Sequence, residues 1–197
     1  MHSPLPRSFY ARETVEVARD LIGKRIVRTL SATRLIGRIV EAEAYRGEDD
    51  PASHAHQGKT DRTVPMFGPP GYTYVYFIYG MHWMFNIVAH RESGPGAVLI
   101  RALEPECGIE VMQDHRGDRP LDKLTDGPAK LAQALAVDGD LNSLDLCDPA
   151  ELTVIDGSLR PEESINAGPR IRVPGDAEAK AHPWRFWIED NAFVSSE

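Results

Sequence analysis

Hydrophobic residues recur with helical spacing near the start of the chain and then change to alternation. Residues 13–22 carry apolar side chains three and four positions apart, and Gly23 follows as a residue that commonly ends a helix. Residues 24–30 are predicted as a short strand. Residues 35–45 alternate between the two faces of a longer second strand. The first 45 residues therefore predict a helix followed by two strands.

A polar segment interrupts this pattern at residues 48–70. It is rich in Gly, Pro, Asp and His, and so long a loop within a compact domain is usually functional or disordered. Strands are predicted beyond it at residues 72–79, 83–89, 97–103, 152–155 and 186–188, with a helix over residues 129–136 that Asp126 caps. Because the strands are not regularly separated by helices, the pattern indicates an α+β fold, and we expect residues 1–197 to form one domain.

Composition narrows the class of protein. A hydrophobic content of 42% excludes a disordered chain, and no apolar run approaches the ~18 residues of a membrane span. Residues 1–11 do not resemble a signal peptide. Cys107 and Cys147 are too few for a disulfide scaffold and lack the spacing of metal ligands. We therefore expect a soluble, cytoplasmic protein without contact to a membrane.

Charge is distributed unevenly along the chain. The net charge is −8, with +3 over residues 1–101 and −11 over residues 102–197. The overall sign argues against nucleic-acid binding. A cluster of six basic residues between Arg19 and Arg38, with Asp20 as the one acid among them, leaves such binding open, because phosphates respond to the local charge of the face they touch. A solvated surface accounts for the cluster equally well.

Two carboxylates and a phenol share one face of the predicted strand 35–45. Glu41, Glu43 and Tyr45 alternate with Ala42 and Ala44, whose face must turn toward a core. The acidic face is then turned either to solvent or to a site, and the strand leads directly into the polar loop, where catalytic groups tend to gather.

The polar loop itself contains Asp49, Asp50, His54 and His56. Imidazole and carboxylate groups are ordinary metal ligands, although this spacing is not a recognised zinc pattern. A single neutral His54, acting as a hydrogen-bonding or acid/base group, explains the loop without a metal. We expect no metal and no cofactor.

Aromatic residues are concentrated in the strand that follows the loop. Tyr72, Tyr74 and Tyr76 share one face, and Tyr79 falls on the other at the strand end. Strands favour aromatic residues for packing, but aromatic rings beside basic residues also stack nucleobases. Asn86 and Arg101 add an amide and a fixed positive charge on the next two strands.

Taken together, these segments resemble the alkyladenine (3-methyladenine) DNA glycosylase family, the type unrelated to helix-hairpin-helix glycosylases. The resemblance rests on "IVEAEAYRGEDDPASHA", "MFGPPGYTYVYFIYGMHWMFNIV" and "VLIRALEP", with "VARDLIGK", "DGPAKLAQAL" and "GPRIRV…PWRFW" in the same order, over nearly the whole chain. It implies a single α+β domain with a curved, mixed or antiparallel sheet flanked by helices. It also implies a monomer that extrudes a damaged purine from double-stranded DNA in base excision repair.

The resemblance assigns a role to each matching position. It implies Glu43 as the catalytic glutamate and Arg101 as an arginine near the attacking water, with Tyr79 as the wedge that fills the gap in the duplex. No lysine stands within the Glu43–Tyr45 motif, so a Schiff base and strand cleavage are not expected. The implied base pocket consists of Tyr45, His54, Tyr76, Asn86 and Ile171, and the implied contacts to the DNA backbone are Lys59, Arg62 and Lys130.

The chain departs from the family pattern at three positions. Asp61 stands where a proline is usual, and Ala129 and Arg172 stand where glycines are usual. None of these changes removes an expected catalytic or pocket residue.

Two other classes of function remain at this point. One is a non-catalytic nucleic-acid-binding module that uses the basic cluster and the tyrosines. The other is a metal-dependent hydrolase that uses Glu41, Glu43, Asp49, His54 and His56.

Overall fold

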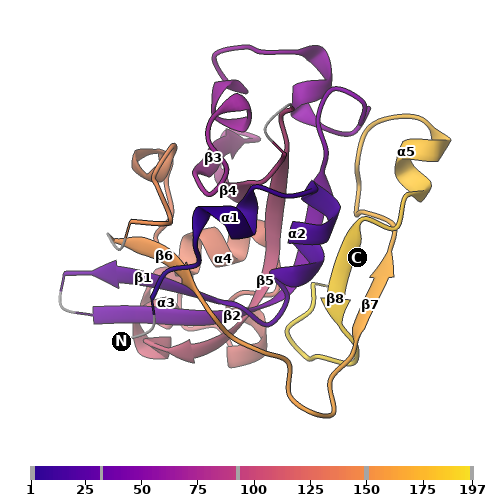
Figure 1. The fold of residues 1–197 in the computed structure, drawn as a ribbon. Helices are drawn as coiled ribbons and strands as arrows, with labels where there is room; N and C mark the ends of the chain where they lie inside the picture. The colour runs from indigo at the N-terminus through magenta and orange to yellow at the C-terminus, as the bar shows by residue number, and fades with distance from the viewer. Residues whose placement is uncertain (1–2, 32, 92–93, 149–150, 196–197) are drawn as a thin grey trace.

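The computed structural model describes residues 3–31, 33–91, 94–148 and 151–195. In this part of the chain eight strands form one sheet, and the pairings between them are antiparallel (Figure 1). The expected α+β class is confirmed. The strands are β1 (Arg25–Leu30), β2 (Thr33–Tyr45), β3 (Thr73–Ile78), β4 (His82–Val88), β5 (Ala97–Cys107), β6 (Leu152–Ile155), β7 (Ile165–Gly168) and β8 (Arg185–Ile188).

Short helices surround this sheet. The α-helices are α1 (Arg7–Tyr10), α2 (Thr14–Asp20), α3 (Ile109–Arg116), α4 (Pro128–Ala134) and α5 (Ala177–Ala181), and the 3-10 turns are η1 (His54–Gln57), η2 (Val64–Phe67), η3 (Leu121–Lys123) and η4 (Gly139–Leu141). In Figure 1, α2 lies in front of the sheet and α4 behind it. β2 and β5 are therefore covered on both faces, and residues such as Ile39 and Ile100 are completely buried.

β2 is the strand at which the sheet divides. The main path runs β3-β4-β5-β2-β1-β6, so one edge of β2 pairs with β5. On the other edge β1 pairs with the start of β2, and β8 pairs with the stretch from Glu41 to Glu43. The β2–β5 register shifts on both sides of Glu41. Because a bulge re-aims side chains, the carboxylates lie at an irregular point where three strands meet.

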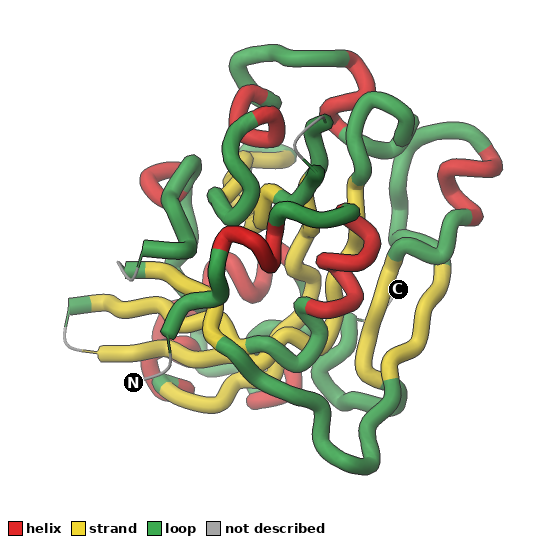
Figure 2. Tube along the Cα trace, in the orientation of Figure 1, coloured by secondary structure: helices red, strands yellow, loops and turns green. Residues whose placement is uncertain are grey.

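The sequence located most of these elements to within a few residues. The expected helices appear as α2 and α4, and the polar loop is largely irregular apart from η1 and η2 (Figure 2). α1, α3, β7 and α5 were not expected. For α3 a signal existed, because Gly108 precedes it and Gly117 follows it, both at positive φ.

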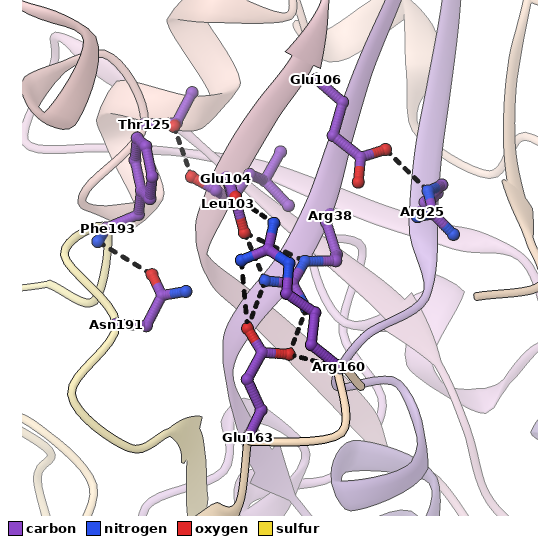
Figure 3. A network of polar contacts seen from close by, with 10 residues as sticks. All are labelled: Arg25, Arg38, Leu103, Glu104, Glu106, Thr125, Arg160, Glu163, Asn191 and Phe193. Carbon is purple, nitrogen blue, oxygen red and sulfur yellow. Dashed lines mark hydrogen bonds and ion pairs between the residues drawn. The ribbon is translucent and has the colours of Figure 1, made fainter. Parts of the chain in front are cut away.

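Four of the six basic residues between Arg19 and Arg38 form ion pairs within the protein, whereas Arg19 and Arg34 are exposed. Arg38 is 1% exposed and pairs with Glu104 and Glu163, and Arg160 joins the same network (Figure 3). The hydrogen bond from Arg38 is the main cause that lowers the pKa of Glu163 to about 2. Three further ion pairs cover the cluster: Lys24 with Asp156 at 2.6 Å, Arg25 with Glu106 at 2.6 Å, and Arg28 with Glu151 at 2.7 Å.

The acids in these pairs all come from the C-terminal half of the chain. These four basic side chains are therefore paired with acids within the protein, and contacts of the cluster to DNA remain a prediction. In the described ranges the longest α-helix has eight residues, and no helix has the length and apolar character of a membrane span.

Candidate active site

A cavity of about 430 Å³ opens beside the C-terminal end of β2. β3, β4 and β5 provide one part of its wall, and the end of β2, the polar loop and the segments 126–130 and 171–174 provide further parts. Its size is that of a pocket for a small organic group such as a nucleobase. Eight of the residues expected to act on DNA line it: Tyr45, His54, Tyr76, Tyr79, Asn86, Arg101, Lys130 and Ile171.

Glu43 lies directly behind this wall, with its side chain fully buried. The Tyr45 hydroxyl donates a hydrogen bond of 2.8 Å to Glu43 Oε2, and the Ile171 backbone N–H donates one of 2.7 Å to Oε1. Arg101 Nη1 lies 3.3 Å from Oε2. These three partners themselves line the cavity, so the carboxylate is held at its edge in a fixed orientation.

Glu41 is equally buried but is held by a different set of partners. Its Oε1 accepts hydrogen bonds from Arg101 Nε at 3.1 Å and from Arg185 Nη1 at 3.2 Å. Its Oε2 accepts a hydrogen bond of 2.8 Å from the backbone N–H of Ser195. Arg101 thus bridges Glu41 and Glu43, which confirms their common face. The reading that this face is exposed to solvent is wrong.

Tyr45 is fixed from its outer side by an arginine. The Arg170 guanidinium lies 4.9 Å from the ring centroids of both Tyr45 and Trp184, and its two terminal nitrogens bond Asp50 at 2.6 and 2.9 Å. Burial, and next the negative charge of Glu43, raise the pKa of the Tyr45 phenol well above its ordinary value. The phenol therefore stays protonated and donates to the carboxylate.

His54, Tyr74 and Tyr76 form an aromatic cluster in the wall of the cavity. His54 Nδ1 lies 3.0 Å from the Tyr74 hydroxyl, and its ring meets the Tyr76 ring edge to face at 4.8 Å. The Arg62 guanidinium covers the Tyr76 ring at 4.9 Å. Burial, and then the charge of Arg62, lower the pKa of His54 to about 4. The imidazole is thus neutral near pH 7.

Asn86 and Tyr79 both line the cavity but differ in exposure. Asn86 is buried on β4, and its amide Nδ2 donates to the Tyr74 carbonyl at 3.0 Å, which fixes the side chain. Tyr79 is 82% exposed in the turn between β3 and β4, where Met81 N–H bonds the Ile78 carbonyl at 3.2 Å. Tyr79 and Gly80 both have positive φ, as the two central residues of a type I′ turn do.

The three residues expected to contact the DNA backbone differ in their surroundings. Lys130 lines the cavity, but its amine pairs with Asp126 at 2.8 Å. Arg62 lines a second hollow of about 260 Å³ beside the first, and Lys59 is exposed in the same loop. Their contacts to DNA remain predictions.

Several residues of the site were not recognised in the sequence. Tyr74, Met66, Met84 and Leu99 contribute to the apolar wall, and Ser195 also lines the cavity. Tyr74 carried a signal, because it shares a strand face with Tyr76. The sequence around Arg170 and Arg185 gave no signal that separates them from arginines on the surface. Their burial depends on partners more than 100 positions away.

The five residues considered as metal ligands are not brought together. Glu41 and Glu43 face Arg101, His54 faces Tyr74, and Asp49 pairs with Arg46 at 2.8 Å. His56 Nδ1 lies 2.6 Å from the Glu48 carbonyl. Among the residues that the structure describes, no three His, Cys, Asp or Glu side chains are grouped so that they could hold a metal ion.

Comparison with known proteins gives one consistent result. Residues 8–192 match the family model described as methylpurine-DNA glycosylase. A "Putative 3-methyladenine DNA glycosylase" of Carboxydothermus hydrogenoformans is 47% identical over 193 residues, which cover 98% of this chain and 99% of the relative. Relatives with the same name in Methanocella arvoryzae and Streptomyces avermitilis are 47% and 45% identical, over 97% and 98% of this chain and 95% and 91% of their own lengths. The resemblance seen in the sequence is confirmed, and the chain belongs to the methylpurine-DNA glycosylase family.

Proposed function

We propose that this protein removes alkylated purines, 3-methyladenine among them, from double-stranded DNA by hydrolysing the N-glycosidic bond with a water that Glu43 activates. The observation that carries the proposal is the buried Glu43 carboxylate, held by Tyr45, Ile171 and Arg101 at the edge of an aromatic-lined cavity. A carboxylate accepts about four hydrogen bonds, and the three partners leave room for one water.

The cavity supports recognition of an extruded base. A base inside the duplex is out of reach, so the nucleotide must rotate out at a cost of a few kcal/mol. Tyr45 and Tyr76 line the cavity from β2 and β3, and stacking on an aromatic ring returns ~1–3 kcal/mol per base. An alkylated purine that carries positive charge gains further from cation–π attraction. Asn86 and the neutral His54 offer hydrogen-bonding groups to the purine edge.

The chemistry needs little beyond a placed water and negative charge. The alkylated purine leaves with the bonding electron pair of the glycosidic bond, and C1′ becomes electron-poor. The water oxygen bonds to C1′ while Glu43 accepts its proton, and the abasic sugar results. The carboxylate also stabilises the positive charge that develops on the sugar. Arg101 orients the carboxylate, and Glu41 balances the charge of Arg101.

We also propose that the enzyme is monofunctional and acts as a monomer in the cytoplasm. The lysine that lines the cavity, Lys130, has its amine in an ion pair with Asp126. Since a Schiff base requires a neutral amine that reaches C1′, this pairing supports hydrolysis without strand cleavage.

The proposal is tested with duplexes that each carry one defined lesion: 3-methyladenine, 7-methylguanine, hypoxanthine or ethenoadenine. Released base is measured under single-turnover conditions with enzyme in excess. We expect release of at least one alkylated purine and none of undamaged adenine or guanine. Absence of release from all four duplexes, with protein that is folded, would contradict the proposal.

A further inference from the structure

Arg172 stands out among the residues around the cavity. It is exposed, lines the cavity directly after Ile171, and has a φ of 51°, in the left-handed region that favours glycine. Among the residues that the structure describes, it makes no hydrogen bond and no ion pair. Arg172 therefore adopts a backbone conformation that is unfavourable for residues other than glycine, and its side chain has no partner among the described residues.

The neighbours of Arg172 explain why the backbone keeps this conformation. The N–H of Ile171 is bound to Glu43, and the buried Arg170 side chain is bound to Asp50 and to the carbonyls of Ala44 and Ala179. The two residues before Arg172 are therefore anchored, Ile171 to Glu43 and Arg170 to Asp50. Strain held by such anchors is typical of functional positions.

The other cations at the cavity are already neutralised. Arg101 faces Glu41 and Glu43, and Lys130 faces Asp126. Among the described residues, Arg172 is thus the cation in the cavity wall that has no carboxylate partner. A nucleotide extruded into the cavity keeps its flanking phosphates at the mouth, and a guanidinium binds phosphate oxygens with two parallel hydrogen bonds.

We infer that Arg172 binds a backbone phosphate of the DNA strand that carries the extruded nucleotide. The inference rests on the proposed function, since it places the damaged strand at this cavity. It also gives a role to one departure from the family pattern. Where a glycine would only permit the turn, this chain adds a positive charge at the mouth of the cavity.

The test compares Arg172→Gln with Arg172→Lys and with Arg34→Gln. Gln and Lys both place a non-glycine residue at this positive φ, so the backbone strain is the same in both variants. Only Gln removes the positive charge. Arg34 is an exposed arginine near the opposite end of β2 from Tyr45, so its substitution changes net charge equally without reaching the cavity. Affinity for a duplex that carries one of the lesions is measured over a series of salt concentrations, with Glu43→Gln present in every protein so that base release is slow, and with a thermal melt of each variant.

The slope of log K against log[salt] should decrease in magnitude by about 0.9 in Arg172→Gln, as expected when one phosphate contact is lost. Arg172→Lys and Arg34→Gln should keep the parent slope. Base release from a lesion duplex at limiting enzyme should become less dependent on salt in Arg172→Gln as well, by the share of one phosphate contact. A parent-like slope in Arg172→Gln, or an equal change in Arg34→Gln, overturns the inference.

The outcomes separate this inference from the proposed function. Released base together with an unchanged Arg172→Gln slope overturns the phosphate contact alone. A parent protein that binds the duplex but releases no base contradicts the proposed function, while a reduced slope still supports a DNA contact by Arg172. A parent protein that does not bind DNA overturns both.

Discussion

The backbone N–H of Ile171 donates a hydrogen bond of 2.7 Å to Glu43 Oε1, across 128 positions of the chain. This contact attaches the segment around Ile171 to the C-terminal part of β2 and fixes one oxygen of the carboxylate, while Tyr45 fixes the other. The orientation of the proposed base therefore depends on two distant parts of the sequence.

Replacing Glu43 by Gln should reduce base release by ~10²–10⁴-fold in single-turnover experiments. Gln keeps the shape and can still accept from Ile171, but it removes the basicity and the negative charge. Glu41→Gln is the matched control and should cost less, because Glu41 acts through Arg101. Release by Glu43→Gln within ~10-fold of the parent rate would remove Glu43 from the role of general base.

Replacing Tyr76 by Ala should weaken capture of the lesion by ~1–3 kcal/mol, the value of one base–aromatic stack. Tyr76→Phe keeps the ring and should stay close to the parent. The measurement is affinity for a lesion duplex relative to an undamaged duplex, with a thermal melt to check folding, since Tyr76 also contacts His54 and Tyr74. An equal loss of affinity in both variants would assign the effect to the hydroxyl instead of the ring.

Tyr79→Ala should lower excision at limiting enzyme, with a smaller loss at saturating enzyme in a single turnover. The side chain is 82% exposed, so its removal should change the free energy of unfolding by less than ~0.5 kcal/mol. Met81, 67% exposed in the same turn, provides Met81→Ala as the control. If Tyr79→Ala lost activity equally in both regimes, Tyr79 would not act as the wedge.

Stability should fall as the pH decreases from about 6.5 to about 4. His54 has a pKa of about 4 in the folded protein against 6.5 for an ordinary imidazole, so between these values the unfolded chain binds more protons. The contribution of His54 to the free energy of unfolding is fully present above about pH 6.5 and is lost as the pH falls toward 4. Denaturant unfolding at several pH values measures it, and His54→Gln should remove this part of the dependence.

The same histidine can be followed directly by NMR titration. Its midpoint should lie near pH 4 in the parent protein and rise in Arg62→Gln, because the charge of Arg62 is the second cause of the lowered pKa. A midpoint near 6.5 in the parent would show that the imidazole is not buried as described.

Base release should leave an abasic strand intact. Because Lys130 is paired with Asp126, neither the parent nor Lys130→Gln should cleave the strand at the abasic site, and borohydride should trap no covalent complex with DNA. Strand cleavage that Lys130→Gln abolishes would contradict the monofunctional proposal. Treatment with a chelator should leave the rate of release unchanged, since the candidate ligands of the described residues are not grouped around a common point.

The sequence by itself determined the local part of this site. Alternation along β2 put Glu41, Glu43 and Tyr45 on one face, and the Tyr45–Glu43 hydrogen bond follows from it. Local spacing is sufficient here, because strand geometry fixes the direction of side chains two residues apart.

Tertiary structure decided how these groups are surrounded. The sequence could not show that Glu41 and Glu43 are fully buried, because the groups that neutralise them come from β5, β8 and the C-terminal segment. Nor could it show that Arg38 is bound by Glu104 and Glu163 and is thus withdrawn from any DNA surface. Ionic and hydrogen-bond partners are chosen by proximity in space, and proximity between residues more than 60 positions apart is set by the packing of the whole sheet.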